Sequence, residues 1–192
     1  MAMPLYDEEI GIEEYLQGEL TSDVRHEYLA GQVYAMVGAS DRHNLIAGNL
    51  FAALHPHVRG TGRQLFMADM KVRLEAPPAG TFFYYPDVML CCDPDDRERY
   101  YRTRPCLLVE VLSDTTWRVD RREKLVTYTQ IPTLRGYLLL DQDRPRAELY
   151  RCDADGTHWR WEQITEGEIP IDCLDASIPL AAVYDEVPLE SP

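Results

Sequence analysis

The sequence lacks the segments that direct a protein into or across a membrane. The stretch from Met1 to Glu9 contains no basic segment followed by an apolar run, which a secretory signal would need. No apolar run approaches the roughly 20 residues that cross a bilayer. Internal repeats, low-complexity tracts and linkers are also missing. We therefore expect a cytoplasmic protein with a single domain over residues 1–192.

Cysteine pairs with the spacing of a metal-binding or redox motif are absent as well. The five cysteines form no C-x-x-C pair, and any disulfide scheme leaves one of them unpaired. This pattern predicts reduced thiols and argues against a zinc site. The cysteines are Cys91, Cys92, Cys106, Cys152 and Cys173.

Positive charge is scarce. The chain has 19 basic and 33 acidic side chains, a formal net charge of −14, which opposes nonspecific binding to a polyanion. A dimeric cleft could still gather its few cations in one place, and bound metal ions would add positive charge. Hydrophobic residues make up 45% and charged residues 27%, as in ordinary globular proteins.

The first half of the chain predicts alternating helices and strands. We expect a short helix at Ile12–Gln17 and a strand through Val33, Ala35 and Val37 after a turn at Gly31. A helix should begin near Ser40 or Asp41, which are plausible N-caps, and end or kink at Pro56. Its apolar face would consist of Leu45, Ile46, Leu50, Ala53 and Leu54.

The second half predicts buried strands and a late hairpin. Every second residue from Leu65 to Glu75 belongs to one apolar face, and this alternation indicates the clearest strand of the chain. The apolar run Cys106–Leu112 is typical of a central strand, and Gly136–Asp141 of another. A helix is expected at 120–130, and a hairpin pairs 146–151 with 158–164 around an Asp-Gly turn. The pattern predicts an α+β fold with an α/β-type core: a mixed sheet flanked by helices.

Two carboxylates stand out against this pattern. Glu110 lies within the apolar run CLLVEVL, where a buried charge is costly unless it is paired or binds a metal. Asp87 follows Pro86 directly and begins the apolar segment Val88–Leu90. Carboxylates at neighbouring strand ends are a common way to hold a hard cation such as magnesium. A turn role for Asp87 and a paired strand-end role for Glu110 are the ordinary alternatives.

The motifs YPDV at 85–88 and LVEVLS at 108–113, followed by Asp120, Lys124, Tyr128 and GYLLLD, resemble the Uma-two family of putative restriction endonucleases. This family is placed in the PD-(D/E)XK nuclease superfamily. The resemblance runs from about Ile12 to Tyr184, and includes EYLAGQVYAM at 27–36 and the segment 40–50. It implies a restriction-endonuclease-like fold.

The resemblance also implies a site. Asp87, Glu110 and the Val111 carbonyl would hold one or two Mg²⁺ ions, for which Mn²⁺ could substitute. The superfamily's lysine, two residues after the Glu, is replaced here by Leu112. The resemblance therefore implies a lysine that has migrated to the following helix, as Lys124, where a surface ion pair with Asp120 is the alternative. Glu27 would add another acid, and His43 would contact a substrate phosphate.

These residues predict a magnesium-dependent endonuclease that cleaves DNA. The missing lysine and the acidic charge support a second reading, a catalytically silent nuclease-fold module that binds nucleic acid or a protein. A metal-dependent phosphoesterase acting on nucleotides is a third. By analogy with restriction enzymes we expect a homodimer, for which the late hairpin could provide the surface. Trp117, Trp159 and Trp161 could stack on bases. Trp159 and Trp161 share one face of a predicted strand, however, which favours packing into the core or a dimer interface.

Overall fold

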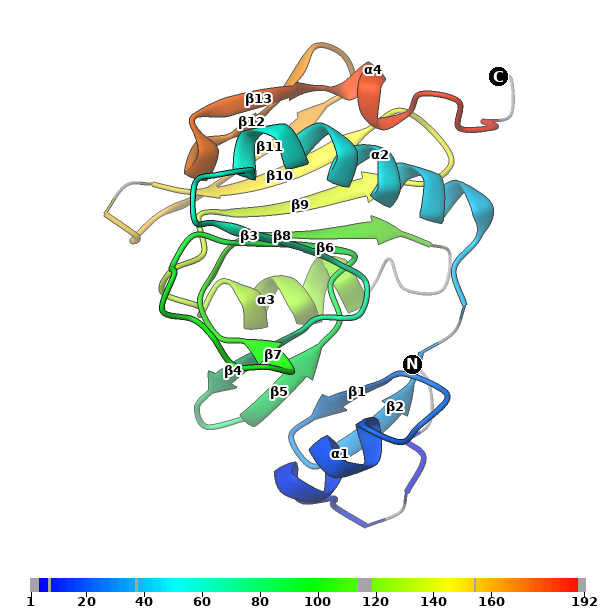
Figure 1. Cartoon of the computed structure of the whole chain (residues 1–192), viewed down its shortest axis with the longest axis vertical. Coiled ribbons are helices and arrows are strands. Elements are labelled where there is room, and N and C mark those ends of the chain that lie inside the picture. The colour runs from blue at the N-terminus through cyan, green and yellow to red at the C-terminus, as the bar shows by residue number, and fades with distance from the viewer. Residues whose placement is uncertain (1–3, 7, 37, 114–118, 154, 190–192) are drawn as a thin grey trace.

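The computed structural model of the chain describes residues 4–6, 8–36, 38–113, 119–153 and 155–189 (Figure 1). Its helices and strands, in chain order, are α1 (Ile12–Glu19), β1 (His26–Leu29), β2 (Gln32–Ala35), α2 (Asp41–Val58), β3 (Gln64–Met67), β4 (Lys71–Ala76), β5 (Gly80–Tyr84), β6 (Val88–Cys91), β7 (Tyr101–Arg102), β8 (Pro105–Leu112), η1 (Val119–Lys124), α3 (Leu125–Tyr128), β9 (Gly136–Asp141), β10 (Ala147–Cys152), β11 (Trp159–Ile164), β12 (Glu168–Ile171), η2 (Asp172–Leu174), β13 (Ala176–Pro179) and α4 (Leu180–Val183).

The centre of the fold is a six-stranded sheet with the order β11-β10-β9-β8-β6-β3. Strand β8 pairs parallel with β9 and antiparallel with β6, so the sheet is mixed. All eight residues of β8 and all six of β9 are buried, as expected for interior strands covered on both faces. The predicted α+β architecture, with a mixed sheet flanked by helices, is confirmed.

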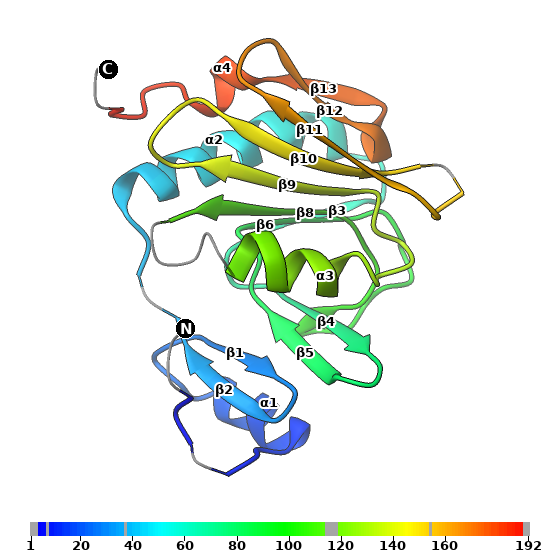
Figure 2. The ribbon, with the colours of Figure 1, turned by 180° about the vertical axis from the view of Figure 1, so that it is seen from behind.

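Helices cover both faces of this sheet. Helix α2 lies across one face in Figure 1, together with the β12–β13 hairpin and α4, while α3 lies across the opposite face in Figure 2. Successive side chains of a strand point to opposite faces, so Val109 and Val111 pack in the α2 core and Leu108 and Leu112 in the α3 core. Glu110 therefore belongs to the α3 face.

A second sheet, with the order β2-β1-β5-β4-β7, continues the structure beyond α3. The single strand predicted from Leu65 to Glu75 is wrong, because β3 belongs to the six-stranded sheet and β4 to the second one. The chain turns between them at Ala68, whose φ of 59° is left-handed and whose N–H bonds the Asp87 carbonyl. Apolar and polar residues continue to alternate through this turn, so the sequence pattern gave no sign that one strand ends and another begins.

The predicted helices form, with differences at their ends and on one face. Ser40 caps α2 by accepting a hydrogen bond from the His43 backbone N–H. The helix passes Pro56 by two residues and ends at Val58. Ile46, Leu50 and Leu54 are buried, but Leu45 is 38% exposed and does not belong to the buried face. The helical segment predicted at 120–130 is a π-helical turn followed by the single turn α3.

The late hairpin forms as predicted, with β10 and β11 antiparallel and Trp161 opposite Tyr150. Trp159 packs against the α3 core, as expected, whereas Trp161 is 54% exposed, so a place for it in a dimer interface stays a prediction. Trp117 lies outside the described residues. None of the helices in the described ranges combines the length and apolar character needed to cross a membrane.

The expectation that all cysteines are reduced thiols is corrected by the structure. Cys92 and Cys106 form a disulfide. Cys92 directly follows β6 and Cys106 is the second residue of β8, and these neighbouring antiparallel strands bring the two side chains together. Spacing along the sequence could not show this pairing. Cys91, Cys152 and Cys173 are free thiols.

Candidate functional site

Asp87 lies where β6 begins, beside the middle of β8. Val88 pairs with Val109, so one further residue along each strand sets Asp87 opposite Glu110. The carboxylate of Asp87 accepts a hydrogen bond of 2.6 Å from the Val111 N–H. Its other oxygen lies 2.8 Å from His43 Nε2, which donates when that nitrogen carries the proton. Asp87 is thus held by groups from β8 and from the first turn of α2.

Glu110 lies in the C-terminal half of β8 and is buried, with 4% of its surface exposed. One of its oxygens, Oε1, accepts hydrogen bonds from Lys124 Nζ at 3.0 Å and from the Tyr128 hydroxyl at 2.9 Å. Burial, then the nearby carboxylate of Glu110, raises the pKa of Tyr128 well above its ordinary value, so the hydroxyl keeps its proton and donates. The buried charge is therefore compensated by an ammonium and a hydroxyl.

Lys124 joins Glu110 to a third carboxylate. Its Nζ lies 3.1 Å from Oε1 of Glu27, which comes from β1 in the second sheet. The two groups are close enough for an ion pair. Glu27 Oε1 is buried, however, and accepts no hydrogen bond from the described residues, Lys124 included. We interpret the contact as a charge attraction that leaves the oxygen without a donor. Lys124 is buried, and the Asp120 side chain of the alternative ion pair lies outside the described residues.

The donor set around these residues suits a hard cation. It contains the carboxylates of Asp87, Glu110 and Glu27, and oxygen ligands of this kind are those that Mg²⁺ prefers. The Val111 carbonyl points to the same side of β8 as its N–H, which faces Asp87. The Glu27 oxygen without a donor is the observation that best fits a cation.

The arrangement is nevertheless more open than a closed metal cage. Within the described residues, the groups of three ligand atoms that all lie within 4.8 Å of one another are Cys92, Cys106 and Cys173, and Asp153, Asp155 and His158. The first three are described below, and the second three lie in the exposed turn after β10. The Asp87 and Glu110 carboxylates are adjacent through β8, but each is held by its own partners.

Sequence reasoning missed the part played by aromatic side chains. Tyr128 stands four residues after Lys124 and therefore shares its helical face, a spacing that could have marked it as a second donor to Glu110. The ring of Tyr84 lies 5.4 Å from Lys124 Nζ and forms one wall of the charged cluster. Burial raises the pKa of Tyr84, so it too stays neutral.

A second buried lysine lies elsewhere in the smaller sheet. Lys71 donates to the Tyr85 hydroxyl at 3.1 Å, and Tyr85 donates to Glu19 at 2.6 Å. Glu19 also lies 2.6 Å from His26 Nδ1. Lys71 and Lys124 are the only lysines of the chain, and both are buried. This cluster joins α1 to the second sheet and shares no residue with the site around Glu110.

The fold and the family of the chain follow from comparisons with known proteins. The crystal structure titled as a putative nuclease belonging to DUF820 from Anabaena variabilis ATCC 29413 matches with a TM-score of 0.71, covering 91% of this chain and 97% of that one. The two sequences are 13% identical, so the likeness shows the fold alone, which is nuclease-like.

The family model Uma2, described as "Putative restriction endonuclease", matches residues 12–181. The chain therefore belongs to the Uma-two family, as its motifs indicated. Two relatives from Synechocystis sp. (strain ATCC 27184 / PCC 6803 / Kazusa) are similar over 145 residues. Uncharacterized protein slr1290 is 38% identical, over 75% of each chain. Uncharacterized protein sll1609 is 32% identical, over 74% of this chain and 80% of the relative.

Proposed function

We propose that the chain is a magnesium-dependent endonuclease that hydrolyses phosphodiester bonds in DNA. Membership of the Uma-two family supports a nuclease, and the observation that carries the proposal is the position of Lys124. Its ammonium lies 3.0 Å from Glu110 although it comes from a separate helical segment. Leu112, which stands at the superfamily's lysine position, shares a strand face with Glu110. Lys124 would therefore supply the ammonium group that a lysine at position 112 would have supplied.

Each residue then has a chemical role. Asp87, Glu110 and the Val111 carbonyl would hold Mg²⁺, or Mn²⁺ in its place, and Glu27 would contribute a further carboxylate. The ion, when bound, lowers the pKa of a coordinated water and offsets negative charge at the phosphate. Lys124 would orient the attacking water and donate a hydrogen bond to a phosphate oxygen. His43 would contact the substrate phosphate, and its contact with Asp87 would also orient that carboxylate.

Metal binding tests this proposal before any substrate is known. We would titrate Mn²⁺ and Mg²⁺ into wild type, Asp87→Ala and Glu110→Ala by calorimetry, with thermal melting to verify folding. Glu75→Gln is the matched control, because this carboxylate is exposed and its partners, Arg73 and Thr81, do not belong to the cluster. We expect wild type and the control to bind, and both site variants to lose binding while remaining folded.

Failure of wild type to bind either ion, even with an oligonucleotide present, would favour a catalytically silent module. The net charge of −14 and the open arrangement of the carboxylates support that alternative. If the metal binds, single-stranded and duplex DNA, RNA and nucleotides should be compared with the same ion. Cleavage of nucleotides alone would indicate a phosphoesterase.

We further propose that the chain forms a homodimer through β11. This strand is an edge of the six-stranded sheet, and its residues from Arg160 to Gln163 are exposed. Two copies paired antiparallel around Trp161 would set Arg160 of each copy opposite Glu162 of the other. Arg160 faces Arg151 within its own chain, and no ion pair to it occurs in the described ranges. The partner would supply the missing carboxylate.

Charge reversal tests this interface. Arg160→Glu and Glu162→Arg each place like charges opposite one another twice in the symmetric dimer. With about 0.2–1 kcal/mol for each cross-strand pair, we expect dimerisation to weaken by about tenfold. The double variant restores opposite charges and should recover the dimer in sedimentation equilibrium. A monomeric wild type, or a double variant no better than the single ones, would refute the interface.

A further inference from the structure

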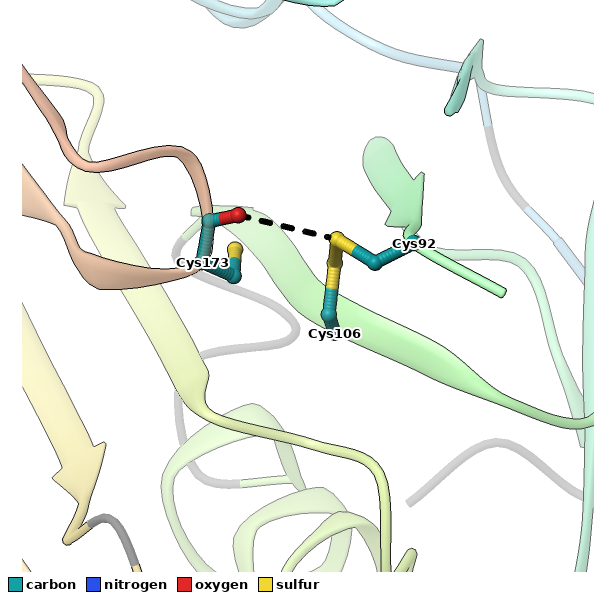
Figure 3. Close-up of side chains that lie close together, drawn as sticks. All are labelled: Cys92, Cys106 and Cys173. Atoms are coloured by element: carbon teal, nitrogen blue, oxygen red, sulfur yellow. Dashed lines mark hydrogen bonds between the residues drawn. A yellow bond between two sulfur atoms is a disulfide. The ribbon is translucent and has the colours of Figure 1, made fainter. Parts of the chain in front are cut away.

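Three cysteine side chains lie close together (Figure 3). Cys92 follows the last residue of β6, whereas Asp87 precedes its first residue, so the cluster lies at the opposite end of that strand from Asp87. Cys92 follows β6, Cys106 belongs to the start of β8, and Cys173 lies in the turn η2 between β12 and β13. Since β6 and β8 are antiparallel, Cys106 stands at the opposite end of β8 from Glu110. The cluster therefore joins the six-stranded sheet to the β12–β13 hairpin, apart from the proposed nuclease site.

The three sulfur atoms all lie within 4.8 Å of one another. The disulfide uses the sulfurs of Cys92 and Cys106, and a covalent link between β6 and β8 does not need the third. Cys173 reaches the pair from a separate layer of the fold, and Figure 3 shows its side chain beside the two bonded sulfurs. A disulfide therefore explains two of these residues but leaves the position of the third unexplained.

The surroundings also accommodate the reduced form. Cys92 Sγ lies 3.8 Å from the Cys173 carbonyl oxygen, and Cys106 Sγ lies 3.3 Å from the Leu90 carbonyl oxygen. A disulfide sulfur has no proton to donate, so these contacts become hydrogen bonds only when the residues are thiols. When the disulfide is reduced, each of the two thiols therefore has a backbone carbonyl oxygen close enough to accept its hydrogen bond.

We propose that Cys92, Cys106 and Cys173 of the reduced chain bind one thiophilic cation, of which Zn²⁺ is the representative. Zn–S bonds of about 2.3 Å in a tetrahedral site set sulfurs roughly 3.8 Å apart, a spacing that the cluster can reach once the disulfide opens. Cys92 and Cys173 are only partly buried, which leaves a fourth position accessible to water. Soft thiolate ligands select zinc or Cu⁺ over magnesium, so this site and the proposed nuclease site would take different ions.

The chemistry balances without an oxidant. A phosphine reductant attacks the Cys92–Cys106 bond and is oxidised to the phosphine oxide by the oxygen of one water molecule, while the two protons of that water complete two thiols. When Zn²⁺ binds, each of the three S–H groups gives its proton to solvent and keeps its electron pair as a thiolate ligand. The bound cation would then clamp β6, β8 and the β12–β13 hairpin in place of the disulfide.

The test uses the full chain, reduced with a phosphine, stripped with a chelator and kept anaerobic. Zn²⁺ is added in competition with a chromogenic chelator, without magnesium or nucleic acid. We expect one Zn²⁺ per chain, and Cd²⁺ should give a thiolate charge-transfer band in the ultraviolet. Alkylation and mass spectrometry should then show protection of Cys92, Cys106 and Cys173 by zinc, while Cys91 and Cys152 gain none.

Cys173→Ser is the decisive variant, and Cys152→Ser the matched control, because Cys152 is buried in β10 outside the cluster. We expect Cys173→Ser to weaken zinc binding by about a hundredfold or more, since loss of even an outer-shell partner costs about 10–100-fold. Absence of zinc binding by the reduced chain, a disulfide that resists reduction, or equal affinity of Cys173→Ser would overturn the proposal. None of these results depends on the nuclease site.

Discussion

Lys124→Met offers the sharpest test of how the candidate site is held together. The ammonium of Lys124 lies within 3.1 Å of Glu27 and 3.0 Å of Glu110, and its removal leaves two largely buried carboxylates without this counter-charge. Methionine keeps the length and apolar character of the stem, so the change is mainly electrostatic. Breaking a buried ion pair from one side costs about 3–5 kcal/mol.

This cost should appear as a lower melting temperature that a divalent cation partly restores. For a chain of this size, 1 kcal/mol corresponds to about 2–4 °C, so we expect a fall of about 6–20 °C in the presence of a chelator. Mn²⁺ would compensate the carboxylate charge that Lys124 no longer neutralises, and we expect it to raise the melting temperature of Lys124→Met more than that of wild type. Mn²⁺ should not restore the proposed nuclease activity to Lys124→Met, because the lysine that would orient the attacking water is missing.

The other lysine supplies the control. Lys71→Met also removes a buried ammonium, from the cluster that contains Tyr85 and Glu19. Lys71→Met should lower the melting temperature, but Mn²⁺ should raise the melting temperature of this variant no more than that of wild type. The reasoning would be refuted if Lys124→Met melted like wild type in chelator, or if Mn²⁺ stabilised the two variants equally.

Three further predictions concern single side chains. Tyr128→Phe removes a hydrogen bond to the Glu110 carboxylate and should cost about 1.5–3 kcal/mol in urea unfolding, and an unchanged midpoint would contradict the contact. Gly136→Ala would place a Cβ 2.9 Å from the Leu107 side chain, and overpacking should cost about 1–3 kcal/mol in the same assay, unless Leu107 yields without strain. Burial lowers the pKa of Lys71, so the unfolded chain binds more protons below the ordinary value of 10.5. The stability of wild type relative to Lys71→Met should therefore rise as the pH increases toward 10.5, and a pH-independent difference would exclude this burial effect.

Local patterns in the sequence accounted for several elements and for two site residues. Ser40 before an amphipathic stretch marked the start of α2, because capping and helical periodicity act over a few neighbouring residues. The apolar runs of β8 and β9 indicated interior strands, because strands covered on both faces need apolar side chains on both. Asp87 and Glu110 were conspicuous as charges next to such runs, and the antiparallel register of β6 and β8 sets them side by side.

Relations between distant segments needed the tertiary structure. Alternation from Leu65 to Glu75 continued through a turn in which the chain changes sheets, so periodicity predicted one strand where there are two. The pairing of Cys92 with Cys106, and the approach of Cys173, depend on strand register and on how the β12–β13 hairpin packs. Neither is encoded in spacing along the chain.

The sequence by itself indicated the family through the resemblance of its motifs. It also determined the α+β class and made the carboxylates of Asp87 and Glu110 conspicuous, because these follow from local composition and periodicity. Only the tertiary structure decided which charges meet. Lys124 comes from a helical segment, Glu27 from the second sheet and Glu110 from the first, and packing brings all three into contact. A buried charge must be compensated by whatever the fold places beside it, and that partner can lie anywhere along the sequence.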